Sequence, residues 1–120
     1  MPFNSDQTKS ILLDLLKFTK KEKIAIGYEP LAITDSAISL LSVPDDANYA
    51  EIRVEKAGST GIIARYLLLG DVVAPADADG MGLSHLDLFD ISSRENLQNF
   101  RVIATSGNTA ILYIQYYKYL

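Results

Sequence analysis

The side chains that most often act as bases and nucleophiles are nearly absent from this chain. It contains one histidine and no cysteine. His85 lies in the alternating segment "LSHLDL", without a G-x-S-x-G motif nearby, so a catalytic triad would depend on this residue alone. We therefore interpret His85 as a structural or surface histidine and predict that the chain is not an enzyme.

Two carboxylates in the segment "EIRVE" have a spacing that invites comparison with glycoside hydrolases. Such enzymes hold two carboxylates about 5–10 Å apart and raise the pKa of one of them in an apolar pocket. Glu51 and Glu55 instead flank Arg53 at alternate positions, which share one face of a strand. A charge-balanced strand surface is the simpler interpretation.

A long loop, "GDVVAPADADGMG", offers Asp71, Asp77 and Asp79 as oxygen ligands of the kind that calcium prefers. The EF-hand register fails, because counting from Asp77 places Leu88 where the bidentate glutamate belongs. Aspartate and glycine are also ordinary turn residues. A solvated turn is thus the simpler interpretation, and we predict no cofactor.

Composition places the chain among ordinary globular domains. It has 120 residues, of which 48% are hydrophobic and 22% are charged, enough for one domain with a buried core. The net charge of −4 argues against nucleic acid as a partner, since phosphate binding requires a concentrated basic surface. Without cysteine, disulfide bonds and thiolate metal sites are excluded.

The apolar run "ILLDLLKF" does not predict a membrane segment. Asp14 and Lys17 interrupt it, and it is far shorter than the roughly 20 residues of a spanning helix. It also lacks the basic region and the cleavage site of a signal peptide. We expect a soluble chain that does not bind membranes and at first remains in the cell that makes it.

Residues 4–21 carry the strongest helix signal. Asn4 or Ser5 can cap the helix, and Gln7 follows Asn4 at the spacing of a capping box. The expected organisation is an amphipathic helix over 1–23 followed by a β-sandwich domain over 24–120. The apolar face either packs on the chain's own sheet or contacts a neighbouring subunit. Its candidate interface residues are Ile11, Leu12, Leu15, Leu16 and Phe18.

From Ile24 onward the hydrophobic period changes from that of a helix to two residues, which indicates strands. Short strands at intervals of about 8–12 residues predict a mainly β fold, either an antiparallel β-sandwich or a jelly-roll-like barrel, with one N-terminal α-helix. The first strand is expected to end at Glu29-Pro30. The predicted strands are 24–28, 31–34, 37–41, 49–55, 62–69, 83–91, 99–105 and 110–119.

Tyrosines dominate the last predicted strand. Tyr113, Tyr117 and Tyr119 share one side of it, whereas Leu112, Ile114 and Tyr116 share the other. One of the two sides must face the core. Outward tyrosines would suit an interface or a sugar site, but tyrosine also packs well across strands. Both interpretations remain open.

The region 49–117 resembles small β-sandwich structural proteins of tailed bacteriophages and prophages. The resemblance covers a little over half of the chain and consists of core and turn positions. The matching positions are Ala50-Glu51-Ile52-Arg53-Val54-Glu55, Gly70, Pro75, Asp79-Gly80, Leu83, Leu97-Gln98-Asn99-Phe100-Arg101-Val102-Ile103-Ala104, Gly107, Ala110-Ile111-Leu112 and Tyr116-Tyr117.

This resemblance implies a virion component, made in the host cytoplasm, that decorates the capsid or belongs to the neck or tail. The expected partners are the chain itself, as a dimer or trimer, and other virion proteins. The interface would use the N-terminal helix, the tyrosines at 113, 117 and 119, or both. The alternative is a carbohydrate- or receptor-binding module that uses exposed tyrosines and the Asp-rich loop.

Overall fold

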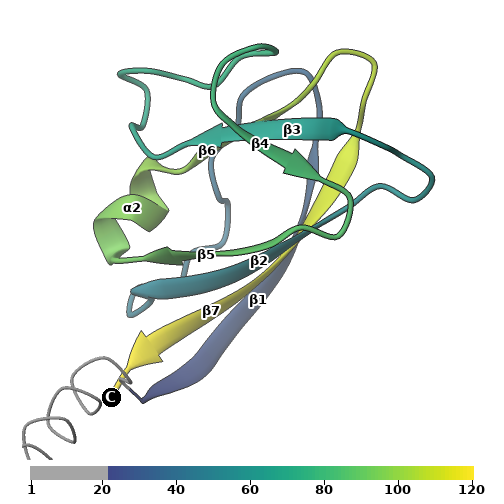
Figure 1. Ribbon diagram of the computed structural model, residues 1–120. Coiled ribbons are helices and arrows are strands. Elements are labelled where there is room, and N and C mark those ends of the chain that lie inside the picture. Colours follow the sequence, from purple (N-terminus) through teal and green to yellow (C-terminus); the bar gives the residue numbers. More distant parts are fainter. Residues whose placement is uncertain (1–21) are drawn as a thin grey trace, which may run out of the picture.

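The computed structural model describes residues 22–120, which form a mainly β domain of two antiparallel sheets (Figure 1). The predicted N-terminal helix lies outside the described residues, as do its candidate interface residues from Ile11 to Phe18. The elements are β1 (Lys23–Ile33), β2 (Tyr49–Glu55), β3 (Ile62–Leu67), β4 (Met81–Ser84), β5 (Leu88–Ser92), α2 (Arg94–Asn99), β6 (Arg101–Ala104) and β7 (Ala110–Tyr119).

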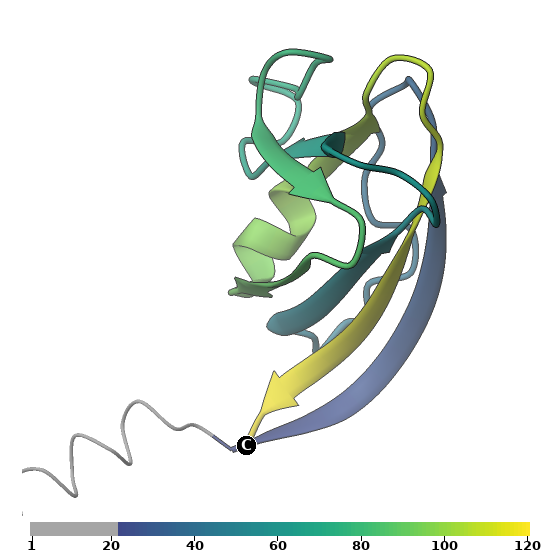
Figure 2. The same cartoon turned by 45° about the vertical axis from the view of Figure 1, so that its right-hand side comes forward.

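The first sheet has the strand order β1-β7-β2-β5, and the second has the order β4-β3-β6. Figure 2 shows the second sheet and α2 on one side of the long, curved strands β1 and β7. Apolar side chains from both sheets meet in one core, to which Ile52 and Leu112 contribute from the first sheet and Ile63 and Val102 from the second. This arrangement is compatible with the predicted β-sandwich.

Strand β1 continues through Glu29-Pro30, so the prediction that it ends there is wrong. Proline has no N–H group and is tolerated where a strand has a neighbour on one side only. Within the part of the chain that the structure describes, β1 is such an edge strand, paired with β7 alone. The segment predicted as a separate strand at 37–41 contributes only one bridge, between Ile38 and Val102 of β6.

The predicted strand 83–91 is in fact two strands that belong to different sheets, β4 and β5. The chain turns between them at Leu86, which has a positive φ of 70°. The carboxylate of Asp87 accepts a hydrogen bond from the Ser84 N–H at 2.7 Å, and the Leu86 N–H donates to the Val54 carbonyl at 2.8 Å. The local bond between Ser84 and Asp87 favours a turn over a continuous strand, and the bond to Val54 fixes this turn beside β2.

The short helix α2 closes one end of the core. The Ser93 hydroxyl caps it by accepting a hydrogen bond from the Asn96 N–H. Leu97 and Phe100 are buried, so this segment packs its two apolar residues against the core.

One polar pair lies inside the core. The Tyr116 hydroxyl donates a hydrogen bond to the Glu29 carboxylate, which also accepts from the Ser42 N–H at 3.2 Å. Tyr116 has no exposed surface, and Glu29 is only 6% exposed. A buried carboxylate without hydrogen-bond partners is strongly destabilising, so Glu29 needs both of these bonds. They connect β1, which carries Glu29, with β7 and with the segment that contains Ser42.

We expect Tyr116→Phe to lower the free energy of unfolding by about 2–3 kcal/mol, because it removes one of the two hydrogen bonds of a buried carboxylate. Tyr117→Phe is the matched control on the opposite side of β7. Its hydroxyl donates to the partly exposed Glu51, so its loss should cost less than about 1 kcal/mol. Urea denaturation of both variants measures the difference, and equal losses would contradict the role given to the Glu29 pair.

Candidate functional site

The face of the first sheet that points away from the second sheet, here called the outer face, carries the candidate tyrosines. Leu112, Ile114 and Tyr116 are buried in the core. Side chains alternate along a strand, so the set that contains Tyr113 and Tyr117 lies on the outer face.

At one end of this face Tyr49, Tyr117 and Tyr119 form a tyrosine cluster. The ring of Tyr49 lies 5.6 Å from that of Tyr117 and 6.0 Å from that of Tyr119. The Lys23 ammonium lies 4.0 Å from the centre of the Tyr49 ring, within the range of a cation–π contact. In this part of the sheet the tyrosines therefore pack across strands, which is one of the two interpretations left open by the sequence.

Hydrogen bonds to carboxylates hold the cluster. The Tyr49 hydroxyl donates to Asp90 at 2.6 Å, and the Tyr117 hydroxyl donates to Glu51 at 3.2 Å. Burial, followed by these hydrogen bonds, raises the pKa of Tyr49 and of Tyr117. Both effects favour the neutral phenol over the phenolate.

Tyr113 lies elsewhere on the outer face, at a shallow depression of about 400 Å³. The depression spans all four strands of the first sheet. Its lining residues are Tyr28, Glu51, Arg53, Glu55, Leu88, Tyr113 and Gln115.

Strand register creates the depression. Tyr28, Gln115 and Glu51 form one row across β1, β7 and β2. Tyr113 of β7 and Arg53 of β2 form the next row, which continues to Leu88 on β5. The three charged residues of β2, Glu51, Arg53 and Glu55, which were predicted to form a charge-balanced surface, thus line part of this depression.

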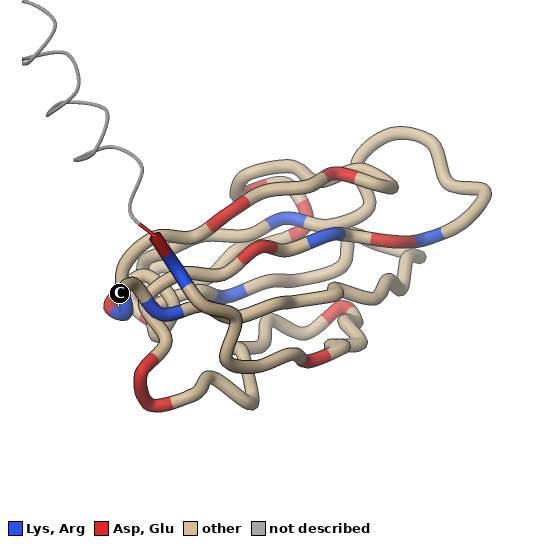
Figure 3. The backbone as a smooth tube through the Cα atoms, turned by 90° about the horizontal axis from the view of Figure 1, so that it is seen from below, with Lys and Arg blue, Asp and Glu red and all other residues tan. Residues whose placement is uncertain are grey.

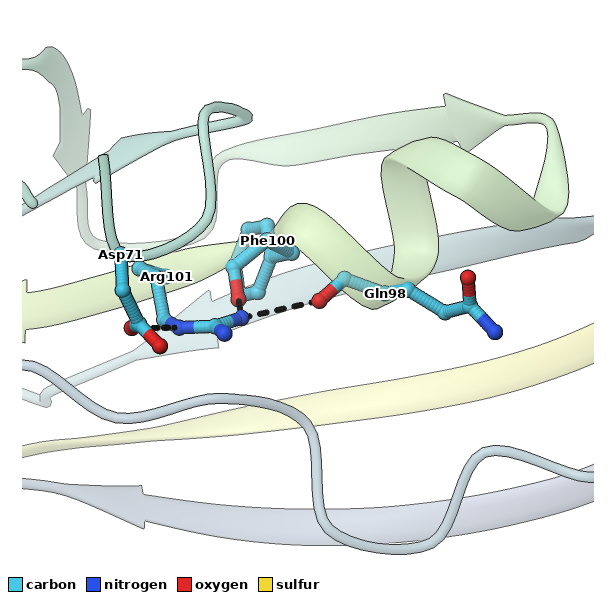
Figure 4. Close-up of polar contacts among 4 residues, drawn as sticks. All are labelled: Asp71, Gln98, Phe100 and Arg101. Atoms are coloured by element: carbon cyan, nitrogen blue, oxygen red, sulfur yellow. Dashed lines mark hydrogen bonds and ion pairs between the residues drawn. The ribbon is translucent and has the colours of Figure 1, made fainter. Parts of the chain in front are cut away.

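The structure does not bring the aspartates of the long loop into this site. Asp71 forms an ion pair with Arg101 at 2.9 Å (Figure 4). The hydrogen bond from this guanidinium, and then its charge, lower the pKa of Asp71. The Asp77 carboxylate accepts a hydrogen bond from the Ser106 N–H, and Asp79 forms a backbone bridge with Ala76.

Within residues 22–120, no group of three or more His, Asp or Glu side chains is arranged to hold a metal ion. The calcium candidates Asp71, Asp77 and Asp79 are therefore separate surface carboxylates in the part of the chain that the structure describes. Figure 3 shows acidic and basic residues interspersed along this part of the chain.

His85 has a main-chain partner. Its Nδ1 atom accepts a hydrogen bond from the Lys56 N–H at 3.0 Å. It lines a second depression of about 490 Å³, together with residues such as Lys56 and Ile111. That the chain is not an enzyme remains a prediction.

Sequence reasoning missed three residues of the first depression: Tyr28, Leu88 and Gln115. Tyr28 was assigned to a strand that was expected to end one residue later. The pairing of β1 with β7 brings it beside Gln115. Alternation within one strand predicts a face, but only the register between strands predicts which residues meet on it.

Comparison with protein-family models, with curated proteins and with solved structures found no match to this chain. Residues 22–120 contain no helix that is long and apolar enough to cross a membrane.

The raised pKa values of the tyrosines predict a loss of stability in alkaline solution. Burial is the first cause for Tyr116, Tyr49, Tyr66 and Tyr117. Unfolding restores an ordinary pKa of about 10, so above this pH the unfolded chain holds fewer protons than the folded chain. The contribution of these tyrosines to stability should be constant below about pH 10 and fall above it, by at most about 1.4 kcal/mol per pH unit for each tyrosine.

Urea denaturation at several pH values, with tyrosinate absorbance as a second signal, measures this effect. Tyr66→Phe is the control, because it keeps the ring that stacks on Phe89 at 4.8 Å and removes only the ionising group. Its stability should fall less steeply above pH 10. A stability that is unchanged between about pH 9 and about pH 11 would contradict the prediction.

Proposed function

We propose that this chain is a β-sandwich structural protein of a bacteriophage virion, acting through protein–protein assembly in capsid decoration, the neck or the tail. The resemblance of region 49–117 to such proteins supports the proposal. Several of the residues that carry the resemblance have a clear role in the fold. Ala50, Ile52 and Val54 are buried in β2, and Gly107 has a positive φ of 77° in the turn before β7. The resemblance thus follows the framework of the fold.

The observation that carries the assembly part of the proposal is the open edge of the first sheet. Strand β1 has 11 residues, and among residues 22–120 it pairs with β7 on one side only. Exposed apolar side chains lie along it or beside its start: Ile24 is 46% exposed, Tyr28 is 62% exposed and Leu120 is 71% exposed. A long edge with such side chains is suited to pair with another chain.

β1 also carries features that limit uncontrolled pairing. Its pairing with β7 shifts register between Ala25 and Gly27, and Pro30 removes one N–H donor. Natural edge strands use such bulges and prolines against aggregation. We therefore favour a closed homo-oligomer, a dimer or trimer, or docking on another virion protein, over an open fibre.

We expect the full-length chain to run as a dimer or trimer in size-exclusion chromatography with light scattering. Ile24→Lys should shift it to monomer, because a lysine on an edge strand opposes pairing and burial. Leu69→Lys is the matched control: Leu69 is 53% exposed and lies outside β1, so this variant should stay assembled. A wild-type chain that stays monomeric at high concentration would refute self-assembly.

The virion assignment is tested by mass spectrometry of purified virions whose genome encodes this chain. We expect the protein at a fixed copy number that is a multiple of its oligomeric state. If it were expressed in infected cells but missing from purified virions, the structural role would be wrong even for a chain that self-assembles.

A further inference from the structure

The depression on the outer face gathers hydrogen-bonding side chains that the described domain does not use. Among residues 22–120, no hydrogen bond or ion pair engages the side chains of Tyr28, Arg53, Glu55, Tyr113 or Gln115. Glu51, which completes the polar lining, is held by Tyr117 and Lys23. Five unengaged polar side chains therefore surround one depression.

Arg53 differs from the three other arginines of the chain, all of which fasten loops. Arg65 donates to the carbonyl oxygens of Asp77 and Gly80. Arg94 donates to the carbonyl oxygens of Pro44 and Ala47. Arg101 donates to two carbonyl oxygens and to Asp71 (Figure 4). Within residues 22–120 only Arg53 leaves its guanidinium available to a ligand.

The charge of the lining is balanced and does not favour anions. The carboxylates Glu51 and Glu55 are balanced by Arg53 and by Lys23, which pairs with Glu51 from outside the lining. A phosphate, a nucleic acid or an acidic sugar would therefore meet no excess of positive charge. A neutral ligand rich in hydroxyl groups needs no such excess, and its hydroxyls could both donate to the carboxylates and accept from the guanidinium.

The shape and the aromatic residues favour the same ligand. A volume of about 400 Å³ lies within the range of small-molecule sites, about 300–1,000 Å³. Tyr28 and Tyr113 border it from neighbouring strands, and their rings offer flat apolar surfaces with a polar tip. A pyranose ring has this pairing of surfaces, with C–H groups on its faces and hydroxyl groups on its rim.

We infer that the depression binds a neutral oligosaccharide. Tyr28 and Tyr113 stack on sugar rings, while Arg53, Glu55 and Gln115 bind the hydroxyl groups. Glu51 accepts a further hydroxyl from its fixed position. This inference does not depend on the virion assignment, because the site lies within one chain.

The experiment applies the full-length protein to an array of neutral and anionic oligosaccharides. The neutral sugar with the strongest signal then enters an NMR titration with ¹⁵N-labelled protein. We expect binding of neutral sugars, with chemical-shift changes that centre on Tyr28, Tyr113 and Gln115. Arg53→Ala and Tyr113→Ala should each weaken binding at least about tenfold, the loss expected for one hydrogen bond to a charged group or one stacking contact.

Val72→Ser is the surface control, since Val72 is 90% exposed and lies outside the depression. It should bind like the wild type, and circular dichroism should show all three variants folded. Four results would each overturn the inference. These are no binding of any neutral sugar, binding of anionic sugars alone, unchanged affinity in both alanine variants, or concentration-dependent shifts without sugar at Arg53 and Tyr113, which lie away from the β1 edge, since such shifts would assign the face to a second copy.

Discussion

The pairing of β7 with both β1 and β2 is the constraint on which the rest of this domain depends. Because β7 has neighbours on both sides, its register fixes which residues of three strands face the core. Leu112, Ile114 and Tyr116 fill the interior, and the alternate residues are then placed on the outer face. A slip of one residue would bury Tyr113 and Gln115 and expose the core residues. The register of β7 therefore determines both the composition of the core and the lining of the depression.

The polar groups of the domain divide into those that stabilise the fold and those that do not. Glu29 is held by Tyr116 and by a main-chain N–H, and Arg94 holds the segment before β2 through two carbonyl oxygens. Such groups have their hydrogen bonds satisfied inside the protein. The side chains around Arg53 are different, because no hydrogen bond or ion pair within residues 22–120 engages Tyr28, Arg53, Glu55, Tyr113 or Gln115. Several such side chains border one depression of the outer face, and their convergence there is the feature of interest.

Much of the framework could be predicted from the sequence, since it depends on local patterns. The alternation in "YAEIRVE" predicted β2, whose bounds in the structure are those expected, Tyr49–Glu55. The errors arose where tertiary context overrides local preference. Pro30 does not end β1, because an edge strand tolerates it, and the turn at Leu86 divides one alternating segment between two sheets. The depression could not be predicted, because it depends on register between strands that are far apart in sequence.

The placement of Glu22 beside Leu120 has a mechanical consequence. The Leu120 N–H donates to the Glu22 carbonyl, and the antiparallel pair β1–β7 begins directly beside them, at Lys23 and Tyr119. A force that separates these two residues loads the ladder at one end, so its hydrogen bonds break one after another and the pair opens like a zipper at low force. A force that enters through Lys23 and leaves through the floor of the outer face, on β2, must instead act across several strands at once. The domain would therefore yield easily between Lys23 and Tyr119, where β1 begins and β7 ends, and resist tension between Lys23 and a ligand bound on the sheet.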